Sequence, residues 1–220
     1  MPDIHVPHLE EEHGQQTTPV KTPRSWRSML RIGLEVLLIT AGVFLGLLGE
    51  QWRENVRHRE LARASLQRFR AEFRANRAEV ERVKDRHVKE RTDLEAYFAV
   101  HNKELMAHVA DLAKPIPSPV PDNVTDSAGF LYSAWDVALA TQSLAYIDPE
   151  LVASMSSVYR LQQLYEDAHR AIAQTSYSFT NTVYWLRGVT AYFGDAVIYE
   201  DLLLKRYAEI LPRLDKALGE

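Results

Sequence analysis

The sequence predicts an all-α protein in which an N-terminal transmembrane helix continues into a long stalk helix, packed with about three further helices as a bundle. Three observations predict this fold class. Residues 32–48 form an apolar run whose only charge is Glu35. Residues 50–112 contain neither proline nor glycine, and their apolar residues recur at helical spacing. No later stretch alternates apolar and polar residues between turn signals, which argues against a sheet.

The composition fits one membrane anchor and one folded domain. The chain has 220 residues, of which 46% are apolar and 25% are charged. The absence of cysteine excludes disulfides, thiolate zinc sites and cysteine nucleophiles. A net charge of −4 gives no indication of a polyanionic partner. The expected order is a disordered tail (1–24), a transmembrane anchor (25–52), a basic stalk helix (53–113), a proline-rich connector (114–124) and a helical bundle (125–220).

The apolar run has the length and the flanks of a membrane span. Its 17 residues cover about 25 Å as a helix, close to the thickness of a hydrocarbon core. Trp26 and Trp52 lie on either side, roughly 39 Å apart along a helix, as aromatic anchors at the two headgroup layers do. The alternatives are a cleaved signal peptide, although no small-x-small cleavage site follows, and a buried helix of a soluble protein.

The predicted orientation places the N-terminus in the cytoplasm and the C-terminal domain outside. Basic residues on the two sides of the run are nearly balanced, so the positive-inside count does not decide. The argument is that a short basic tail resists export, whereas a long C-terminal domain translocates largely regardless of charge. The four basic residues on each side are Lys21, Arg24, Arg27 and Arg31 before the run, and Arg53, Arg57, Arg59 and Arg63 after it.

Two features inside the span suggest a function. Gly42 and Gly46 form a small-xxx-small pair, and Gly49 and Glu35 share their face, so this stripe is a candidate helix–helix contact. The alternative is that glycine is simply common in membrane helices. Glu35 is a candidate functional carboxylate because intramembrane charges are costly. The explanation that we favour is an ion pair with Arg31, one helical turn earlier.

The stretch EVLLITAGVFLGLLGEQWREN, residues 35–55, resembles a family of uncharacterised bacterial single-pass membrane proteins. Members carry a glutamate at the start of an apolar run, a central glycine and a tryptophan followed by an acid, after which a basic helix begins. The matching positions here are Glu35, Gly42, Trp52 and Glu54. The resemblance implies a bacterial inner-membrane location and supplies no activity, substrate or catalytic residue.

The predicted stalk helix carries one apolar seam in heptad spacing. We expect this seam to pack against the C-terminal helices of the same chain, and a dimeric coiled coil is the alternative. Three polar residues, Asn76, His87 and Glu90, occupy seam positions, which disfavours a purely dimeric coil. The apolar seam consists of Ala62, Leu66, Phe69, Phe73, Val80, Val83, Leu94 and Tyr97.

Charge is distributed unevenly along the chain. Residues 50–91 hold 13 basic residues against eight acidic ones, and residues 92–220 hold nine against 17. This asymmetry favours pairing within the chain, together with ion pairs along the helix. Contact with anionic lipid headgroups is a second interpretation for the first turns after the span. Nucleic-acid binding is not predicted, because many acids share the stalk and no reader motif is present.

Beyond the stalk, turn and capping signals divide the chain into helices. Prolines at every second position between 115 and 121 indicate an extended spacer. A helix is then expected from Thr125 or Asp126 through Ala145. Asp148 as N-cap and Pro149 at the first position predict the next helix.

In this interpretation, glycines determine where that helix ends and where the last helix starts. We expect the helix that begins at Pro149 to run through Tyr184 and Trp185 and to end before Gly188. A last helix is expected to start at Gly194-Asp195 and to be interrupted near Pro212.

The sequence offers only weak candidates for site chemistry. Glu166 and His169 form a single Glu-x-x-His pair, whereas di-iron bundles need two such pairs. His101, Glu104 and His108 can share one helical face as a mononuclear metal site, but solvated polar residues at such spacing are commoner. We therefore predict no metal, no cofactor and no catalytic residue. The aromatic residues Tyr132, Trp135, Tyr146, Tyr159 and Tyr165 either line a small-ligand pocket or, as is commoner, belong to the core.

Three classes of function remain open. The favoured hypothesis is a membrane-anchored interaction or scaffold protein that self-associates through the glycine stripe and binds an unknown protein partner through the distal bundle. The second is a small-ligand sensor that relays through a partner. The third is a metal-dependent enzyme. The lipid bilayer is the one partner that the residues themselves identify.

Overall fold

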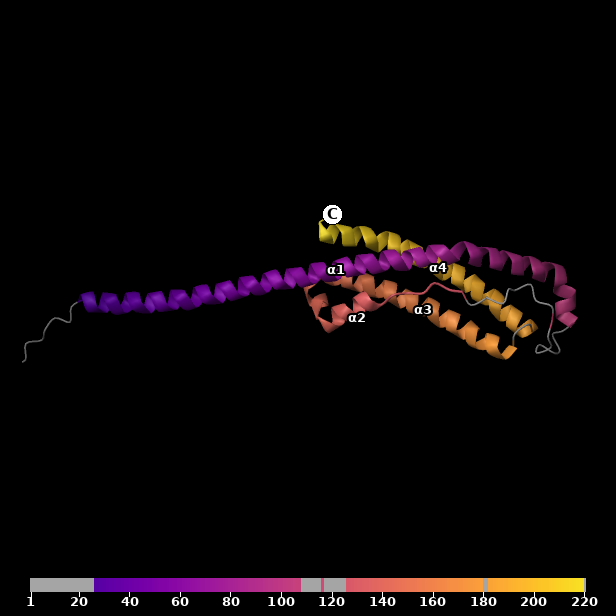
Figure 1. The fold of residues 1–220 in the computed structure, drawn as a ribbon, viewed down its shortest axis with the longest axis horizontal. Helices are drawn as coiled ribbons and strands as arrows, with labels where there is room; N and C mark the ends of the chain where they lie inside the picture. Colours follow the sequence, from indigo (N-terminus) through magenta and orange to yellow (C-terminus); the bar gives the residue numbers. More distant parts are fainter. Residues whose placement is uncertain (1–25, 108–115, 117–125, 180–181, 220) are drawn as a thin grey trace, which may run out of the picture. The chain divides into compact units, whose positions relative to one another are not determined.

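The computed structural model describes residues 26–107, 116, 126–179 and 182–219, with the side chains of 27, 28 and 176–179 excepted. Within these ranges the regular structure is helical apart from an isolated bridge at Thr182. The predicted all-helical bundle is therefore confirmed. In chain order the elements are α1 (Trp26–Ala107), α2 (Ser133–Ala140), the 3-10 helix η2 (Ser143–Tyr146), α3 (Pro149–Phe179) and α4 (Val183–Leu218) (Figure 1).

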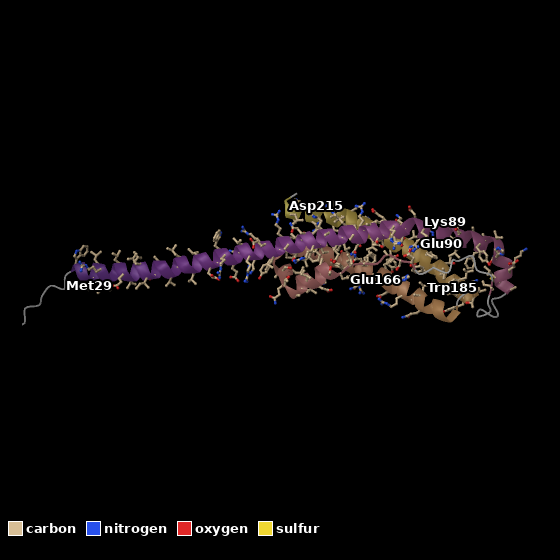
Figure 2. The ribbon with its side chains drawn as sticks, viewed as in Figure 1. Met29, Lys89, Glu90, Glu166, Trp185 and Asp215 are labelled. Carbon is tan, nitrogen blue, oxygen red and sulfur yellow. The ribbon has the colours of Figure 1, made fainter. Side chains whose placement is uncertain are left out.

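The chain divides into two units between Trp52 and Arg53, inside α1. In the first unit, residues 26–52 form a helix whose most apolar stretch has no buried residue. Its side chains stand out around the ribbon in Figure 2, beginning near Met29. The hydroxyl of Thr40 donates to the carbonyl of Val36 at 2.8 Å, which satisfies a polar group on an apolar surface. By length and composition, this helix is able to cross a bilayer.

In the second unit, the seam of α1 forms one wall of the hydrophobic core. The first seven seam residues are buried and Tyr97 is half-buried. Phe69 makes an edge contact with Tyr159 of α3 at a ring separation of 6.2 Å, and Phe73 lies 6.0 Å from Tyr207 of α4. The predicted packing within one chain is thus confirmed. Each buried phenylalanine contributes about 1.5–3 kcal/mol through removal from water.

Ion pairs also join the basic part of α1 to acidic residues further along the chain. Arg70 lies 3.3 Å from the carboxylate of Asp215 in α4, and Lys84 lies 2.5 Å from that of Asp201. These contacts confirm that the charge asymmetry is at least partly satisfied inside the molecule. Because the pairs are partly exposed, each contributes about 0–1 kcal/mol and serves mainly to orient the helices.

The helix predicted from residue 125 or 126 through 145 is wrong in its first half. Residues 126–132 are not helical, and α2 begins at Ser133. The reason lies in α1. The side-chain amide of Asn76 donates to the carbonyl of Leu131 and accepts from its N–H, both at 2.9 Å. A buried amide thus binds the backbone groups that a helix would otherwise pair, and an extended segment lies against α1 instead.

The predicted start of α3 is confirmed, and its predicted end is wrong. The N–H of Leu151 donates to the carboxylate of Asp148 at 2.9 Å, as an N-cap requires. However, α3 ends at Phe179 and does not continue through Trp185. Thr182 caps a new helix, since its hydroxyl oxygen accepts from the N–H of Trp185 at 3.1 Å.

The predicted restart at Gly194 and interruption at Pro212 are also wrong, because α4 is continuous from Val183 to Leu218. Buried residues on both sides of Gly194 keep one apolar face unbroken. Proline inside a helix costs about 3 kcal/mol, and burial of Leu211 and Leu214 on either side of Pro212 offsets that cost. The helix ends at Gly219, whose φ of 79° is left-handed.

Candidate functional site

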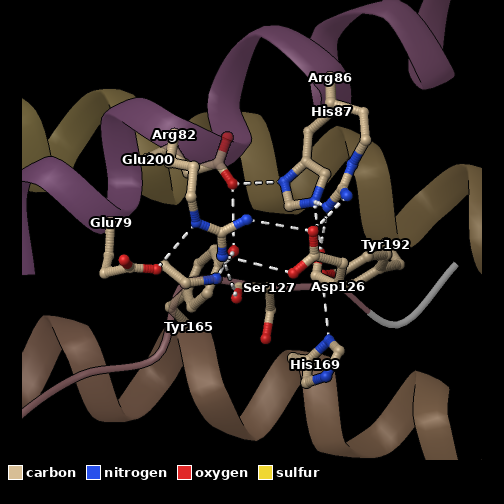
Figure 3. Close-up of polar contacts among 11 residues, drawn as sticks. Glu79, Arg82, Arg86, His87, Asp126, Ser127, Tyr165, His169, Tyr192 and Glu200 are labelled. Carbon is tan, nitrogen blue, oxygen red and sulfur yellow. Dashed lines mark hydrogen bonds and ion pairs between the residues drawn. The ribbon is translucent and has the colours of Figure 1, made fainter. Parts of the chain in front are cut away.

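A buried polar cluster joins α1, α3 and α4 (Figure 3). His87 of α1 and Glu200 of α4 are both fully buried, and the ring Nδ1 lies 2.5 Å from the carboxylate Oε1. The other ring nitrogen, Nε2, lies 2.9 Å from the backbone carbonyl of Asp126. The hydroxyl of Tyr165 in α3 donates to the same carboxylate oxygen at 3.1 Å and accepts from the N–H of Ala128.

Nε2 of His87 lies between the backbone carbonyl of Asp126 at 2.9 Å, which can only accept, and the guanidinium of Arg86 at 3.4 Å, which can only donate. The short contact between Nδ1 and Glu200 contains a proton, because two lone pairs would repel each other at 2.5 Å. Oε1 of Glu200 also accepts from the hydroxyl of Tyr165. The other carboxylate oxygen, Oε2, is buried and has no hydrogen-bond partner within the described residues, so the pair is only partly satisfied by hydrogen bonds.

Partly exposed charged residues lie beside the cluster, around Asp126. Its carboxylate binds the guanidinium of Arg82 at 3.2 Å and also that of Arg86. The hydrogen bond from Arg82, together with that from Arg86, lowers the pKa of Asp126, although desolvation acts in the opposite direction. The guanidinium of Arg86 also donates to the carbonyl of Asp126 at 2.6 Å. Two arginines from α1 thus hold the extended segment that supplies the carbonyl for His87.

A second buried carboxylate, Glu72, lies on α1 about four helical turns before His87. Glu72 of α1 accepts hydrogen bonds from the hydroxyl of Tyr159 at 2.5 Å, from the hydroxyl of Ser133 at 2.8 Å and from the N–H of Ala134 at 2.8 Å. Burial, with the neighbouring Glu72, raises the pKa of Tyr159. Glu72 therefore holds the start of α2 against α1 and α3.

These buried groups do not have the access that catalysis requires. His87 and Glu200 are enclosed on all sides, so neither reaches a solvent-borne substrate in this structure. Glu72 is also buried, and all three of its donors belong to the protein. The arrangement therefore holds α1, α3 and α4 together through buried hydrogen bonds.

A groove between α3 and α4 is open to solvent and is a second candidate site. Its volume is about 810 Å³, within the range of small-molecule sites. Most of its lining is apolar, and polar groups come from Thr175, Arg187 and Asp195. Tyr192 of α4 connects the groove to the polar cluster, since its hydroxyl lies 3.1 Å from Nδ1 of His169 and its ring packs edge-on to His87. Burial, with the charge of His87, lowers the pKa of His169.

The candidate metal ligands are not brought together by the described part of the fold. His101 and Glu104 form a contact of 3.0 Å on the surface of α1, while His108 lies outside the described residues. His169 bonds to Tyr192 and not to Glu166. No group of three histidine or acidic side chains within the described ranges can hold a metal ion.

The candidate residues of the first unit are all exposed. A Cβ atom added at Gly42, Gly46 or Gly49 would meet nothing within 4 Å, so the stripe is free on this helix. The rings of Trp26 and Trp52 are 74% and 73% exposed. Glu35 is also exposed. It forms no ion pair with Arg31 in this structure, and the expected pairing at this position is not observed.

Sequence reasoning missed the pairing of His87 with Glu200 and the role of Glu72. Asn76 and His87 were visible as polar residues at seam positions, which was a usable signal that α1 buries hydrogen-bonding groups. Their partners were not visible, because Glu200 and Leu131 are more than 50 residues away in sequence. Glu72 stands one position from the seam residue Phe73 and gave no signal of its own.

Fold and site together define an all-helical bundle that follows an apolar helix and contains buried charges. Comparison of the chain with protein-family models, with curated protein sequences and with solved structures finds no match.

Proposed function

We propose that this protein is a single-pass membrane protein whose helical bundle acts by binding other molecules and not by catalysis. The observation that carries the proposal is the exposure of the apolar helix in residues 26–52, whose leucine, isoleucine and phenylalanine side chains have no protein partner. A contiguous apolar surface of this size is unfavourable in water and favourable in lipid. In the proposed arrangement, Trp26 and Trp52 mark the two headgroup layers.

The resemblance to bacterial single-pass proteins supports an inner-membrane location. In the proposed orientation the N-terminus lies in the cytoplasm and the bundle lies outside. Because the chain contains no cysteine, single cysteines can report the side of the membrane. We expect Gln163→Cys, at an exposed position of α3, to react with a membrane-impermeant maleimide in intact spheroplasts, and Glu10→Cys to react only after lysis. The reverse pattern would invert the proposed orientation.

Membrane anchoring itself is tested by placing charge in the apolar surface. We expect the double variant Leu38→Arg, Leu45→Arg to leave the carbonate-washed membrane fraction, since each arginine costs about 2.5–3.5 kcal/mol at the centre of a span. The matched control is Leu139→Arg, at an exposed leucine of α2, which stays with the membrane. Recovery of the unaltered chain in the soluble fraction without detergent would contradict the proposal.

Self-association through the glycine stripe is part of the proposal. The open space beside Gly42 and Gly46 supports it, because a second helix can approach closely there. We expect Gly42→Ile, Gly46→Ile to abolish dimerisation of the full-length chain in a membrane dimerisation assay. Gly33→Ile is the control, since Gly33 lies on the opposite side of the helix from Gly42 at 100° per residue. Equal association of both variants would remove this part of the proposal.

A second candidate function is that of a ligand-responsive module. The groove between α3 and α4 favours it, because it is accessible, largely apolar and joined through Tyr192 to the polar cluster that holds α1, α3 and α4 together. A ligand there would act on helix packing only if it binds one packing better than another. Thermal unfolding of the full chain with and without candidate ligands tests this function, since a ligand that binds the folded state raises the melting temperature.

A further inference from the structure

The groove between α3 and α4 exists because small residues line its floor. The two helices are antiparallel neighbours, and where they cross the groove they present alanine or glycine at Ala168, Ala171, Gly188 and Ala191. The helices are close at one point of this floor, since a Cβ atom at Gly188 would lie 3.3 Å from Cδ1 of Ile172. Larger side chains at Ala171 and Ala191, which are both exposed, would fill the groove without entering the core.

The two ends of the groove differ in charge. Arg187 is exposed near the end where α3 and α4 meet in sequence, and Thr175 faces the same groove from α3. Asp195 lies two helical turns further along α4, roughly 12 Å from Arg187 along the axis. Within the described part of the chain, no acidic side chain pairs with Arg187. The Arg187 end therefore favours an anion, whereas the Asp195 end disfavours one.

The rest of the lining is apolar and partly aromatic. Tyr184 and Tyr192 flank the floor, and Met106 of α1 reaches the groove from the side. An apolar body that covers this floor would remove alanine, isoleucine and tyrosine surface from water. Tyrosines eight residues apart on α4 suit a flat or elongated apolar body.

From this lining we propose that the groove binds a water-soluble small molecule with an apolar, flat or elongated body and one anionic group. The anionic group lies at Arg187, and the body extends over Ala171 and Ala191 toward Tyr192. This inference names the ligand class for the second function proposed above and rests on that function. Because Tyr192 contacts both His169 and the ring of His87, an occupied groove touches a residue that is shared with the buried cluster.

The test is a binding measurement on the full-length protein in nanodiscs of zwitterionic phosphatidylcholine, with empty nanodiscs as the blank. Three probes share one aromatic body and differ in charge: 2-naphthylacetate, neutral 2-naphthylacetamide and the cation 2-(2-naphthyl)ethylammonium. Saturation-transfer difference NMR and equilibrium dialysis report binding. We expect the carboxylate to bind at least tenfold more tightly than either of the other probes, since charge-assisted hydrogen bonds are about twice as strong as neutral ones.

Two variants locate the probe. Arg187→Gln is expected to weaken 2-naphthylacetate about tenfold and to leave the neutral amide unchanged. Ala191→Phe fills the groove and is expected to abolish binding of all three probes. The matched controls are Arg160→Gln, at an exposed position of α3, and Leu139→Phe on α2, and both should bind as the unaltered chain does. Far-UV circular dichroism and thermal unfolding confirm that each variant retains its fold.

The outcomes separate the ligand class from the function. Equal or tighter binding of the neutral or cationic probe that Ala191→Phe abolishes would overturn the anionic class and keep the groove as a ligand site. Absence of binding by all three probes, or binding that Ala191→Phe does not change, would overturn both. Nanodiscs containing anionic phosphatidylglycerol form the last arm. Competition with 2-naphthylacetate there would assign the groove to a lipid headgroup and overturn the soluble ligand.

Discussion

Residues 26–52 and residues 53–107 belong to one helix, yet their side chains are distributed in opposite ways. In the first part, apolar side chains cover the whole circumference and all of them are exposed. In the second part, most apolar side chains form one buried seam, and arginines and acids cover most of the remaining surface. A helix that is apolar all round needs an apolar surrounding, whereas a helix with one seam needs only a partner on that side. The α-helix is common to both parts, and the distribution of apolar side chains around it differs.

The largest expected effect comes from truncating a phenylalanine in each part. We expect Phe73→Ala to lower the free energy of unfolding of the bundle by about 3–5 kcal/mol, because Phe73 is fully buried and leaves a cavity. Phe44→Ala should leave that free energy unchanged, because Phe44 is 64% exposed. Urea unfolding of the full chain in detergent, followed by circular dichroism, measures both. Equal effects would break the comparison between the two parts.

The next effect concerns the buried His87–Glu200 pair. We expect Glu200→Gln to destabilise the bundle by about 3 kcal/mol, since removal of the carboxylate leaves the ring of His87 buried without its partner. The double variant His87→Leu, Glu200→Leu should be less destabilised than Glu200→Gln, because neither member of the pair is left buried alone. Urea unfolding at pH 7 measures both variants. A double variant that is less stable than the single one would show that the pair contributes more than its removal from water costs.

A smaller effect is expected at the second buried carboxylate. Glu72→Gln retains the shape of the side chain but puts a donor group where three donors now converge, so we expect a loss of about 2 kcal/mol. The same denaturation experiment measures it. The control is Glu81→Gln, at an exposed position of α1 whose ion pair with Arg77 contributes about 0–1 kcal/mol. An equal response at the two positions would mean that burial of Glu72 has no energetic consequence.

The smallest effect is a dependence on pH at His169. Because its pKa is lowered in the folded chain, the unfolded chain binds its proton first as the pH falls. Stability that is fully present above the ordinary pKa of about 6.5 is therefore lost as the pH decreases below it. We expect His169→Gln to reduce this loss, measured as the melting temperature at pH 7.5 and pH 5.5. The neutral control Gln163→Ala should show the same loss as the unaltered chain.

Most of the helical framework could be predicted from local patterns. The heptad positions from Ala62 to Leu94 identified the buried face of α1, because burial of one stripe imposes its spacing on the sequence. Asp148 and Pro149 marked the start of α3, because capping depends on neighbouring residues only. The ends of α3 and α4 were not predictable in this way. Gly194 and Pro212 are breakers by local preference, and burial of the surrounding apolar face outweighs that preference.

By itself, the sequence determined the helical class, the exposed apolar segment and the seam, since each depends on residues within a few turns of one another. Only the tertiary structure decided that His87 meets Glu200, that Asn76 binds the backbone of Leu131 where a helix was expected, and that α3 and α4 leave a groove with Arg187 on its edge. These contacts join residues far apart in the chain. Their energies depend on burial and on the direction of single hydrogen bonds, which no local spacing records.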